Sequence, residues 1–100
     1  MSNAQKPQGR PFSLDRYRAE AKGDPFELWL DADKSIVVQR PTGDQMFKAE
    51  EAFRSGTSRQ ALEAMCGDQA DEVLSVLGGE DAAVMRAVAE DMQGHFGLQG

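Results

Sequence analysis

The stretch that decides the fold runs from Gly67 to Gly97 and reads GDQADEVLSVLGGEDAAVMRAVAEDMQGHFG. Its first half places apolar residues at the helical spacing i, i+3, i+4, i+7: Ala70, Val73, Leu74 and Leu77. Its second half spaces them by three, four and four: Met85, Val88, Met92 and Phe96. Two amphipathic helices this short are unstable alone in water. Each therefore needs an apolar surface to lie against, in this chain or in another.

The ends of these two helices are predicted from their polar and glycine residues. Asp68 stands where an N-cap is expected, so we predict that it caps the first helix. Gly78 and Gly79 predict a left-handed exit from that helix. Acidic residues Glu80 and Asp81 then begin the second helix, where they face the positive end of its dipole.

Outward from this stretch, the N-terminal half predicts a helix and a hairpin. Ser13 can cap a helix over 14–22, whose apolar stripe is too thin to form a core by itself. Residues 26–30 alternate between apolar and other side chains, and residues 35–39 are rich in β-branched side chains. These two runs predict a β-hairpin over 26–39 with a loop of about four residues.

Two capping boxes predict the helices between the hairpin and the deciding stretch. Thr42 and Thr57 are each followed three residues later by a glutamine, and Gly56 and Gly67 end the two helices. The predicted fold class is α+β, mainly α-helical (about five short helices), with an N-terminal two-stranded antiparallel β-hairpin. The predicted organisation is a disordered arm over 1–11 and a single α+β domain over 12–98. That domain comprises the helix 14–22, the hairpin 26–39 and a helical part 43–97.

The charge of the 100-residue chain is −6 and is unevenly distributed. Up to Lys22 there are five basic and two acidic residues, a net charge of about +3, whereas the remainder carries six basic and fifteen acidic residues, about −9. An acidic body argues against nucleic acid as the main partner, because phosphate contacts need a basic face. It favours a basic partner or simple solubility.

The sequence favours a cytoplasmic protein without a membrane anchor. Cys66 is the only cysteine, so the chain cannot form an internal disulfide, and a reducing cytoplasm fits best. There is no run of 18 apolar residues and no apolar signal-peptide core in the first dozen residues. We therefore expect neither a membrane span nor a secretion signal.

The residues that carry catalysis in other proteins are too sparse here to predict an enzyme. His95 is the only histidine, and it falls in the last turn of a predicted helix, where a cation is favoured. Cys66 lies on an apolar helix face and is expected to be a small buried residue. Asp31 and Asp33 begin like a calcium loop but lack the glycine and the closing glutamate. We predict no catalytic residue, no metal site and no cofactor.

The remaining candidates are surfaces for binding another protein. The predicted partner-binding residues are the four of the last helical stripe, Met85, Val88, Met92 and Phe96, together with Trp29. Methionine adapts to irregular apolar partners, but the simpler interpretation, which the spacing favours, is that this stripe forms the domain's own core. Trp29 points away from the apolar side of its strand, so it is either covered by the first helix or exposed as an anchor.

The order of these segments resembles a known family. A short helix (SLDRYRAEA, 13–21) precedes a strand-turn-strand (PFELWLDADKSIVVQRP, 25–41), a charged helix (TGDQMFKAEEAFRSG, 42–56) and the closing stretch. The segments that carry the resemblance most clearly are Val38-Gln39-Arg40-Pro41 and the closing DMQGHFG, residues 91–97. Over roughly residues 13–98 the chain resembles the tail assembly chaperones of long-tailed (siphovirus-type) actinobacterial bacteriophages.

The resemblance implies a non-enzymatic, transient role in virion assembly. Such chaperones bind the tape-measure protein, keep it soluble, promote recruitment of the major tail protein and are absent from the mature virion. Recruitment is implied to occur through a longer product of programmed ribosomal frameshifting. The family is also associated with self-association into open oligomers. The implied location is the host bacterial cytoplasm.

Other classes of protein remain open at this point. The chain could be a small structural virion protein, such as a head-tail connector or tail completion protein. It could also be a bacterial adaptor or regulatory protein, or a small enzyme or metal protein built on His95. Presence in the finished particle, gene neighbourhood and metal content would discriminate among these classes.

Overall fold

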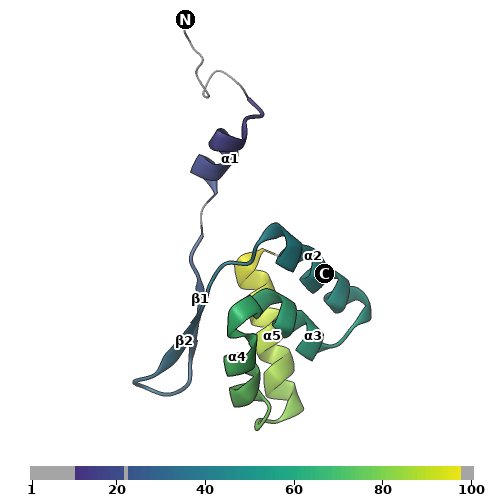
Figure 1. Cartoon of the computed structure of the whole chain (residues 1–100). Coiled ribbons are helices and arrows are strands. Elements are labelled where there is room, and N and C mark those ends of the chain that lie inside the picture. Colours follow the sequence, from purple (N-terminus) through teal and green to yellow (C-terminus); the bar gives the residue numbers. More distant parts are fainter. Residues whose placement is uncertain (1–10, 22, 98–100) are drawn as a thin grey trace, which may run out of the picture.

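The computed structural model describes residues 11–21 and 23–97, and it confirms a mainly helical fold with an antiparallel hairpin near the N-terminus (Figure 1). The elements follow one another in this order: α1 (Leu14–Glu20), β1 (Phe26–Trp29), β2 (Ser35–Val38), α2 (Gly43–Ser55), α3 (Ser58–Cys66), the 3₁₀ turn η2 (Gly67–Gln69), α4 (Ala70–Leu77) and α5 (Ala82–Phe96). The predicted disordered arm, residues 1–11, lies outside the described residues except for Pro11.

The hairpin forms as its alternating pattern predicts. Its register pairs Phe26 with Val38 and Leu28 with Ile36, so these four apolar side chains share one face. Ile36 and Val38 are buried, and the two β1 residues are half-buried against the core. In the turn, Oδ1 of Asp31 accepts hydrogen bonds from the backbone N–H groups of residues 33 and 34. These two hydrogen bonds stabilise the turn, so the loop does not need a glycine.

Both predicted capping boxes are present. The hydroxyl of Thr42 accepts from the N–H of Gln45, whose side chain accepts in return from the N–H of Thr42. Thr57 and Gln60 repeat this exchange at the start of α3. Gln45 makes one further contact, because its Nε2 donates to the carbonyl of Ala64 at 3.1 Å. That bond ties the beginning of α2 to the end of α3.

The predicted cap at Asp68 is wrong. Asp68 lies within η2, and the N-cap of α4 is Gln69, which makes no side-chain capping bond. The reason is that α3 passes directly into the 3₁₀ turn. The N–H of Ala70 bonds to the carbonyl of Gly67, so the preceding turn satisfies a donor that a side-chain cap would otherwise serve.

The predicted left-handed exit at Gly78 is also wrong. Gly78 has φ −63° and ψ −23°, which is right-handed, and its N–H bonds to the carbonyl of Leu74. The chain leaves α4 through successive tight turns before Asp81 caps α5 by accepting from the N–H of Ala83. The left-handed exit is found instead at Gly97, which ends α5 with φ 75° and ψ 24°. Gly67 also has a positive φ, 56°, and an added Cβ there would lie 2.5 Å from Nε2 of Gln45.

Helix α1 is shorter than predicted and stands apart. It begins at the predicted Ser13 cap but ends at Glu20 rather than residue 22, because Ala21 is already extended. No residue of α1 is buried. In Figure 1, α1 lies beyond the start of the hairpin, away from the helical body.

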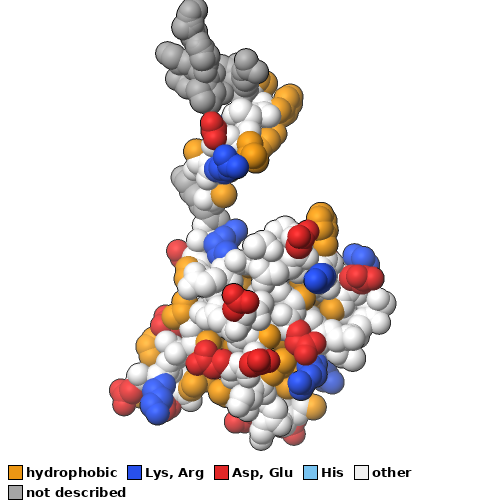
Figure 2. Space-filling model, in the orientation of Figure 1, with side chains coloured by type: hydrophobic (Ala, Val, Ile, Leu, Met, Phe, Trp, Pro, Cys, Tyr) orange, Lys and Arg blue, Asp and Glu red, His pale blue; other side chains and the backbone are white. Residues whose placement is uncertain are grey.

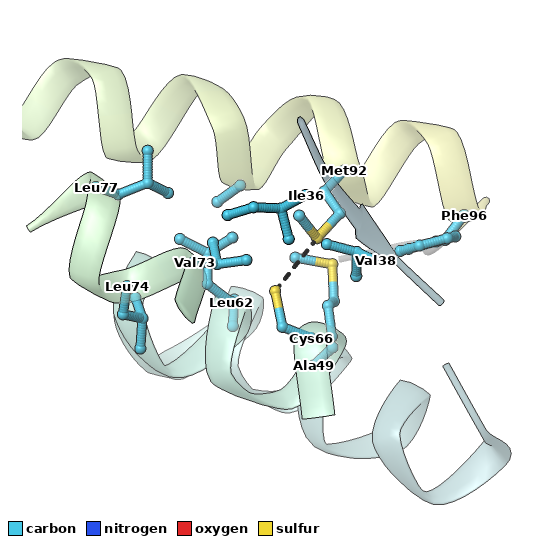
Figure 3. Packing of buried hydrophobic residues seen from close by; sticks show 13 residues of the cluster. Ile36, Val38, Ala49, Leu62, Cys66, Val73, Leu74, Leu77, Met92 and Phe96 are labelled. Carbon is cyan, nitrogen blue, oxygen red and sulfur yellow. Dashed lines mark hydrogen bonds between the residues drawn. The ribbon is translucent and has the colours of Figure 1, made fainter. Parts of the chain in front are cut away.

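The core lies where α3 packs against α2, α4 and α5, with the apolar face of the hairpin closing one side (Figure 3). Its largest fully buried side chains come from four elements: Val38, Leu62, Met65, Val73 and Met92. Near its centre, Sγ of Cys66 lies 3.9 Å from Sδ of Met92. The helices of the deciding stretch thus find their apolar surface within this chain.

Candidate partner-binding surfaces

The structure places the predicted stripe of α5 mainly inside the protein. Met92 is fully buried and Phe96 is 7% exposed, while Met85 and Val88 are partly buried against the core. The same helical spacing therefore serves the domain's own packing, the alternative that the sequence left open. Of the five predicted binding residues, Trp29 is the one that the structure leaves exposed.

Trp29 belongs to a set of exposed apolar side chains on the hairpin. Its side chain is 58% exposed and is not covered by α1. The register puts Val37 diagonally across from it on the same face, and Leu30 follows it in the chain. Both of these neighbours are exposed. We call Trp29, Leu30 and Val37 the hairpin patch.

Two side chains from the helical half hold the hairpin in place. The amide of Gln69 accepts from the N–H of Gln39 at 2.9 Å and donates to the carbonyl of Val37. It therefore occupies the outer edge of β2 much as a neighbouring strand would. These contacts reach across some thirty residues of sequence. The orientation of the hairpin patch is consequently fixed relative to α4.

His95 provides the second attachment. Its Nε2 lies 3.0 Å from the carbonyl oxygen of Asp24 and 3.1 Å from that of Pro25, so this nitrogen donates to the chain just before β1. The imidazole also makes edge-on contacts with Phe26 and Phe96, with ring centroids 5.4 and 5.3 Å apart. The single histidine, in the last turn of α5 as predicted, here positions the hairpin.

Cys66 lies in an environment that suppresses nucleophilic chemistry. Burial raises the pKa of its thiol from 9.0 to about 11, because the apolar surroundings disfavour the thiolate. The residue is 3% exposed. It is therefore a small buried packing residue, as its place on an apolar helix face predicts.

Among residues 11–21 and 23–97, no group of three or more His, Cys, Asp or Glu side chains is placed to hold a metal ion. Over the same part of the chain, every helix falls short of the length and apolar content that crossing a lipid bilayer demands.

Helix α1 exposes Leu14 and Tyr17 of the thin apolar stripe that the sequence predicts for it, and Phe12, just before the helix, is exposed as well. Sequence reasoning missed one exposed apolar side chain, Phe47 on α2, which is 71% exposed. A signal for Phe47 existed in the sequence. It stands one position from the stripe Met46, Ala49 and Phe53, so it points about 100° away from the side that packs inward.

A groove runs between α2 and α3. It has a volume of about 540 Å³ and is open to solvent. Small residues line part of it: Ala52, Ser55, Gly56 and Ala64. The charged residues of its lining are Lys48, Glu51 and Glu63. Phe47 is not among the residues that line this groove.

The arrangement as a whole offers apolar contact surfaces on an acidic body, which Figure 2 displays as orange patches among many red side chains. No family model, curated protein or solved structure matches this chain.

Proposed function

We propose that this chain is a non-enzymatic phage tail assembly chaperone that binds the tape-measure protein through the hairpin patch. The observation that supports this proposal is the exposure of Trp29, at 58%, on a hairpin fixed by Gln69 and His95. A large aromatic side chain held in a defined orientation loses little conformational entropy on binding, which is why such residues serve as interface anchors.

The charge of the body suits this role physically. A tape-measure protein is a long amphipathic helix whose apolar face would aggregate if left uncovered. The hairpin patch covers part of that face, and the net charge of about −9 beyond Lys22 favours the solubility of the coated tape measure. The chaperone thus keeps the tape measure soluble in the host bacterial cytoplasm.

The proposal extends to recruitment and release. A longer frameshifted product recruits the major tail protein onto the coated tape measure. The chaperone then leaves as tail subunits replace it, so it is absent from the mature virion. This exchange requires that each chaperone bind the tape measure with only modest affinity. A contact made by three apolar side chains is small enough to meet that requirement.

The direct test is co-expression with a phage tape-measure protein. Trp29→Asp should lower the soluble fraction of the tape measure several-fold, because a carboxylate replaces the apolar anchor. Val84→Asp is the matched control, since Val84 is 40% exposed on α5 and lies outside the hairpin patch. Equal solubilisation by both variants, each shown to be folded by circular dichroism, would contradict the assigned surface.

A second test separates the chaperone from a structural virion protein. Mass spectrometry of purified particles should detect the major tail protein but not this chain. Stoichiometric amounts of the chain in the particle would favour a head-tail connector or tail completion protein instead.

A further inference from the structure

The backbone of β1 presents hydrogen-bonding groups on the side away from β2. The N–H of Leu30 donates to the carbonyl of Lys34 at 2.8 Å, and these two residues continue the register of the strands as a hydrogen-bonded pair. Such pairs alternate with non-hydrogen-bonded ones along an antiparallel ladder, so Trp29 opposite Ser35 is of the second kind, as is Glu27 opposite its own partner. The N–H and C=O groups of Glu27 and Trp29 therefore point outward from β1.

The other edge of the hairpin is already occupied. On β2, the Gln69 amide accepts from the N–H of Gln39 and donates to the carbonyl of Val37, as a neighbouring strand would. Just before β1, the carbonyl of Pro25 accepts from Nε2 of His95 at 3.1 Å. Among residues 11–21 and 23–97, β1 pairs with β2 alone, so the two outward residues of β1 have no strand beside them. The outer edge of β1 is thus open to strand addition.

The side chains of β1 define what a strand added to this edge should carry on each of its faces. Phe26 and Leu28 lie on the core side and are half-buried, so apolar residues of an added strand would extend that surface. Glu27 and Trp29 are exposed on the opposite side. The Glu27 carboxylate accepts from Oγ of Ser35 at 2.9 Å, which holds it over the hairpin. A matching segment therefore alternates apolar residues with residues that suit a carboxylate and an indole.

The charge around this edge is negative. Residues 23–33 contain four exposed acidic side chains and no Lys or Arg: Asp24, Glu27, Asp31 and Asp33. Lys34 and Arg40 reduce the net charge of residues 23–40 to −2, from four acidic and two basic residues. In the part of the chain that the structure describes, the ion pairs lie within α1 and α3, so none involves these four acids. Like charges opposite one another destabilise strand pairs, which disfavours the same edge of a second copy and favours a basic segment.

We propose that the outer edge of β1 binds an extended, basic segment of another protein by strand addition. Apolar residues of the segment continue the side of Phe26 and Leu28, and its lysine or arginine residues lie beside Glu27 and Trp29. Main-chain hydrogen bonds provide the pairing, and charge and alternation provide the selectivity. This site uses backbone groups and an extended ligand, whereas the hairpin patch is assigned to the apolar face of a helix, so either assignment can fail without the other.

Hydrogen exchange of the full chain, followed by nuclear magnetic resonance, tests the proposal. The probe is a peptide of about seven residues that alternates valine and lysine, used up to about 1 mM because so small an interface binds weakly. Exchange at the amides of Glu27 and Trp29 should slow at least about fivefold, since an added strand bonds to both. The Val37 amide, which faces outward on the other edge, is the internal control.

Three results of this experiment would overturn the proposal. The first is unchanged exchange at Glu27 and Trp29, or equal slowing at Val37. The second is an equal effect from a matched peptide that alternates valine and glutamate, because the acidic edge should repel it. The third is protection of Glu27 and Trp29 that grows with protein concentration in the absence of peptide, because a second copy would then occupy the edge.

A pair of substitutions at Glu27 separates the backbone from the charge. Glu27→Pro removes the outward N–H but no bond to β2, and proline is tolerated at such edge positions. It should weaken binding of the valine–lysine peptide at least about tenfold, whereas Glu27→Thr, which keeps the N–H, should weaken it about threefold. Equal weakening by both variants, or wild-type affinity in a folded Glu27→Pro variant, would refute strand addition. The exchange data on the wild-type chain decide the question whether or not Glu27→Pro folds.

Discussion

Among single residues, Met92 is the buried side chain through which two helices contact each other near the centre of the core. It is fully buried on α5, and its sulfur lies 3.9 Å from that of Cys66 on α3 (Figure 3). Two elements therefore depend on the same side chain. The sequence made Met92 a candidate for contact with a partner. Because the structure buries this side chain, a substitution at Met92 should instead change the stability of the protein.

We predict that Met92→Ala lowers the free energy of unfolding by about 2–5 kcal/mol, because it removes buried apolar contacts and leaves a cavity. Met92→Leu, which nearly conserves volume, should cost less than about 1.5 kcal/mol. Urea denaturation followed by circular dichroism measures both. A Met92→Ala variant as stable as wild type would show that this side chain is not in the core.

Cys66 gives the protein a stability component that depends on pH. Its pKa is raised from 9.0 to about 11 by burial, so the folded state holds the thiol proton more tightly than the unfolded state. The contribution is fully present below pH 9 and is lost as the pH rises towards 11. Denaturation between pH 8 and 11 should show this decline. Cys66→Ala should lack that component, and an identical slope in both proteins would contradict it.

At the scale of elements, the two capping boxes form a matched pair with one difference. Gln60 serves the cap of α3, whereas Gln45 serves the cap of α2 and also donates to the carbonyl of Ala64. Gln45 therefore couples two helices, and Gln60 supports one. The extra contact is part-buried, so its loss is not simply replaced by water.

We predict that Gln45→Ala destabilises the protein by about 1 kcal/mol more than Gln60→Ala. Each variant loses its reciprocal cap, and the first additionally leaves the Ala64 carbonyl without its donor. Thermal unfolding of the two variants gives the comparison. Equal losses of stability would mean that the link between α2 and α3 contributes nothing.

The caps also indicate how far the sequence could predict the fold. Thr42, Thr57 and Ser13 were predicted correctly because a capping bond spans three residues and depends little on the rest of the chain. Asp68 and Gly78 were predicted wrongly because their backbone follows from how α3 runs into α4 and how α4 turns towards α5. Those features depend on packing between helices.

At the scale of the whole molecule, the hairpin is attached to the helical body by its apolar face and by two polar side chains, Gln69 and His95. A two-stranded hairpin is marginally stable by itself. The polar attachments set its orientation. Neither could be predicted from the sequence, because their partners lie some thirty and seventy residues away.

We predict that Gln69→Ala speeds hydrogen exchange at the Gln39 amide by about five- to tenfold, since the loss of about 1 kcal/mol per hydrogen bond promotes local opening. Amides inside α3 should be unaffected, and they serve as the internal control. Exchange followed by nuclear magnetic resonance resolves the two regions. Unchanged protection at Gln39 would mean that the amide bridge does not restrain β2.

Some of the candidate surfaces could be predicted from the sequence and others could not. The pattern of residues 26–30 placed Trp29 on the outer side of its strand, which the register confirms. Periodicity alone could not decide whether the stripe containing Met92 faced this chain or another, because both need the same spacing. The groove between α2 and α3 could not be predicted at all, since it exists only where these two helices lie together.

The position of Trp29 has a practical consequence, because it is the only tryptophan in the chain and lies 58% exposed on the hairpin patch. Its indole fluorescence is a built-in optical probe of that patch rather than of the core. Emission should begin at long, water-like wavelengths and shift to the blue as a partner covers the ring. The unmodified protein thus carries its own label for a binding titration.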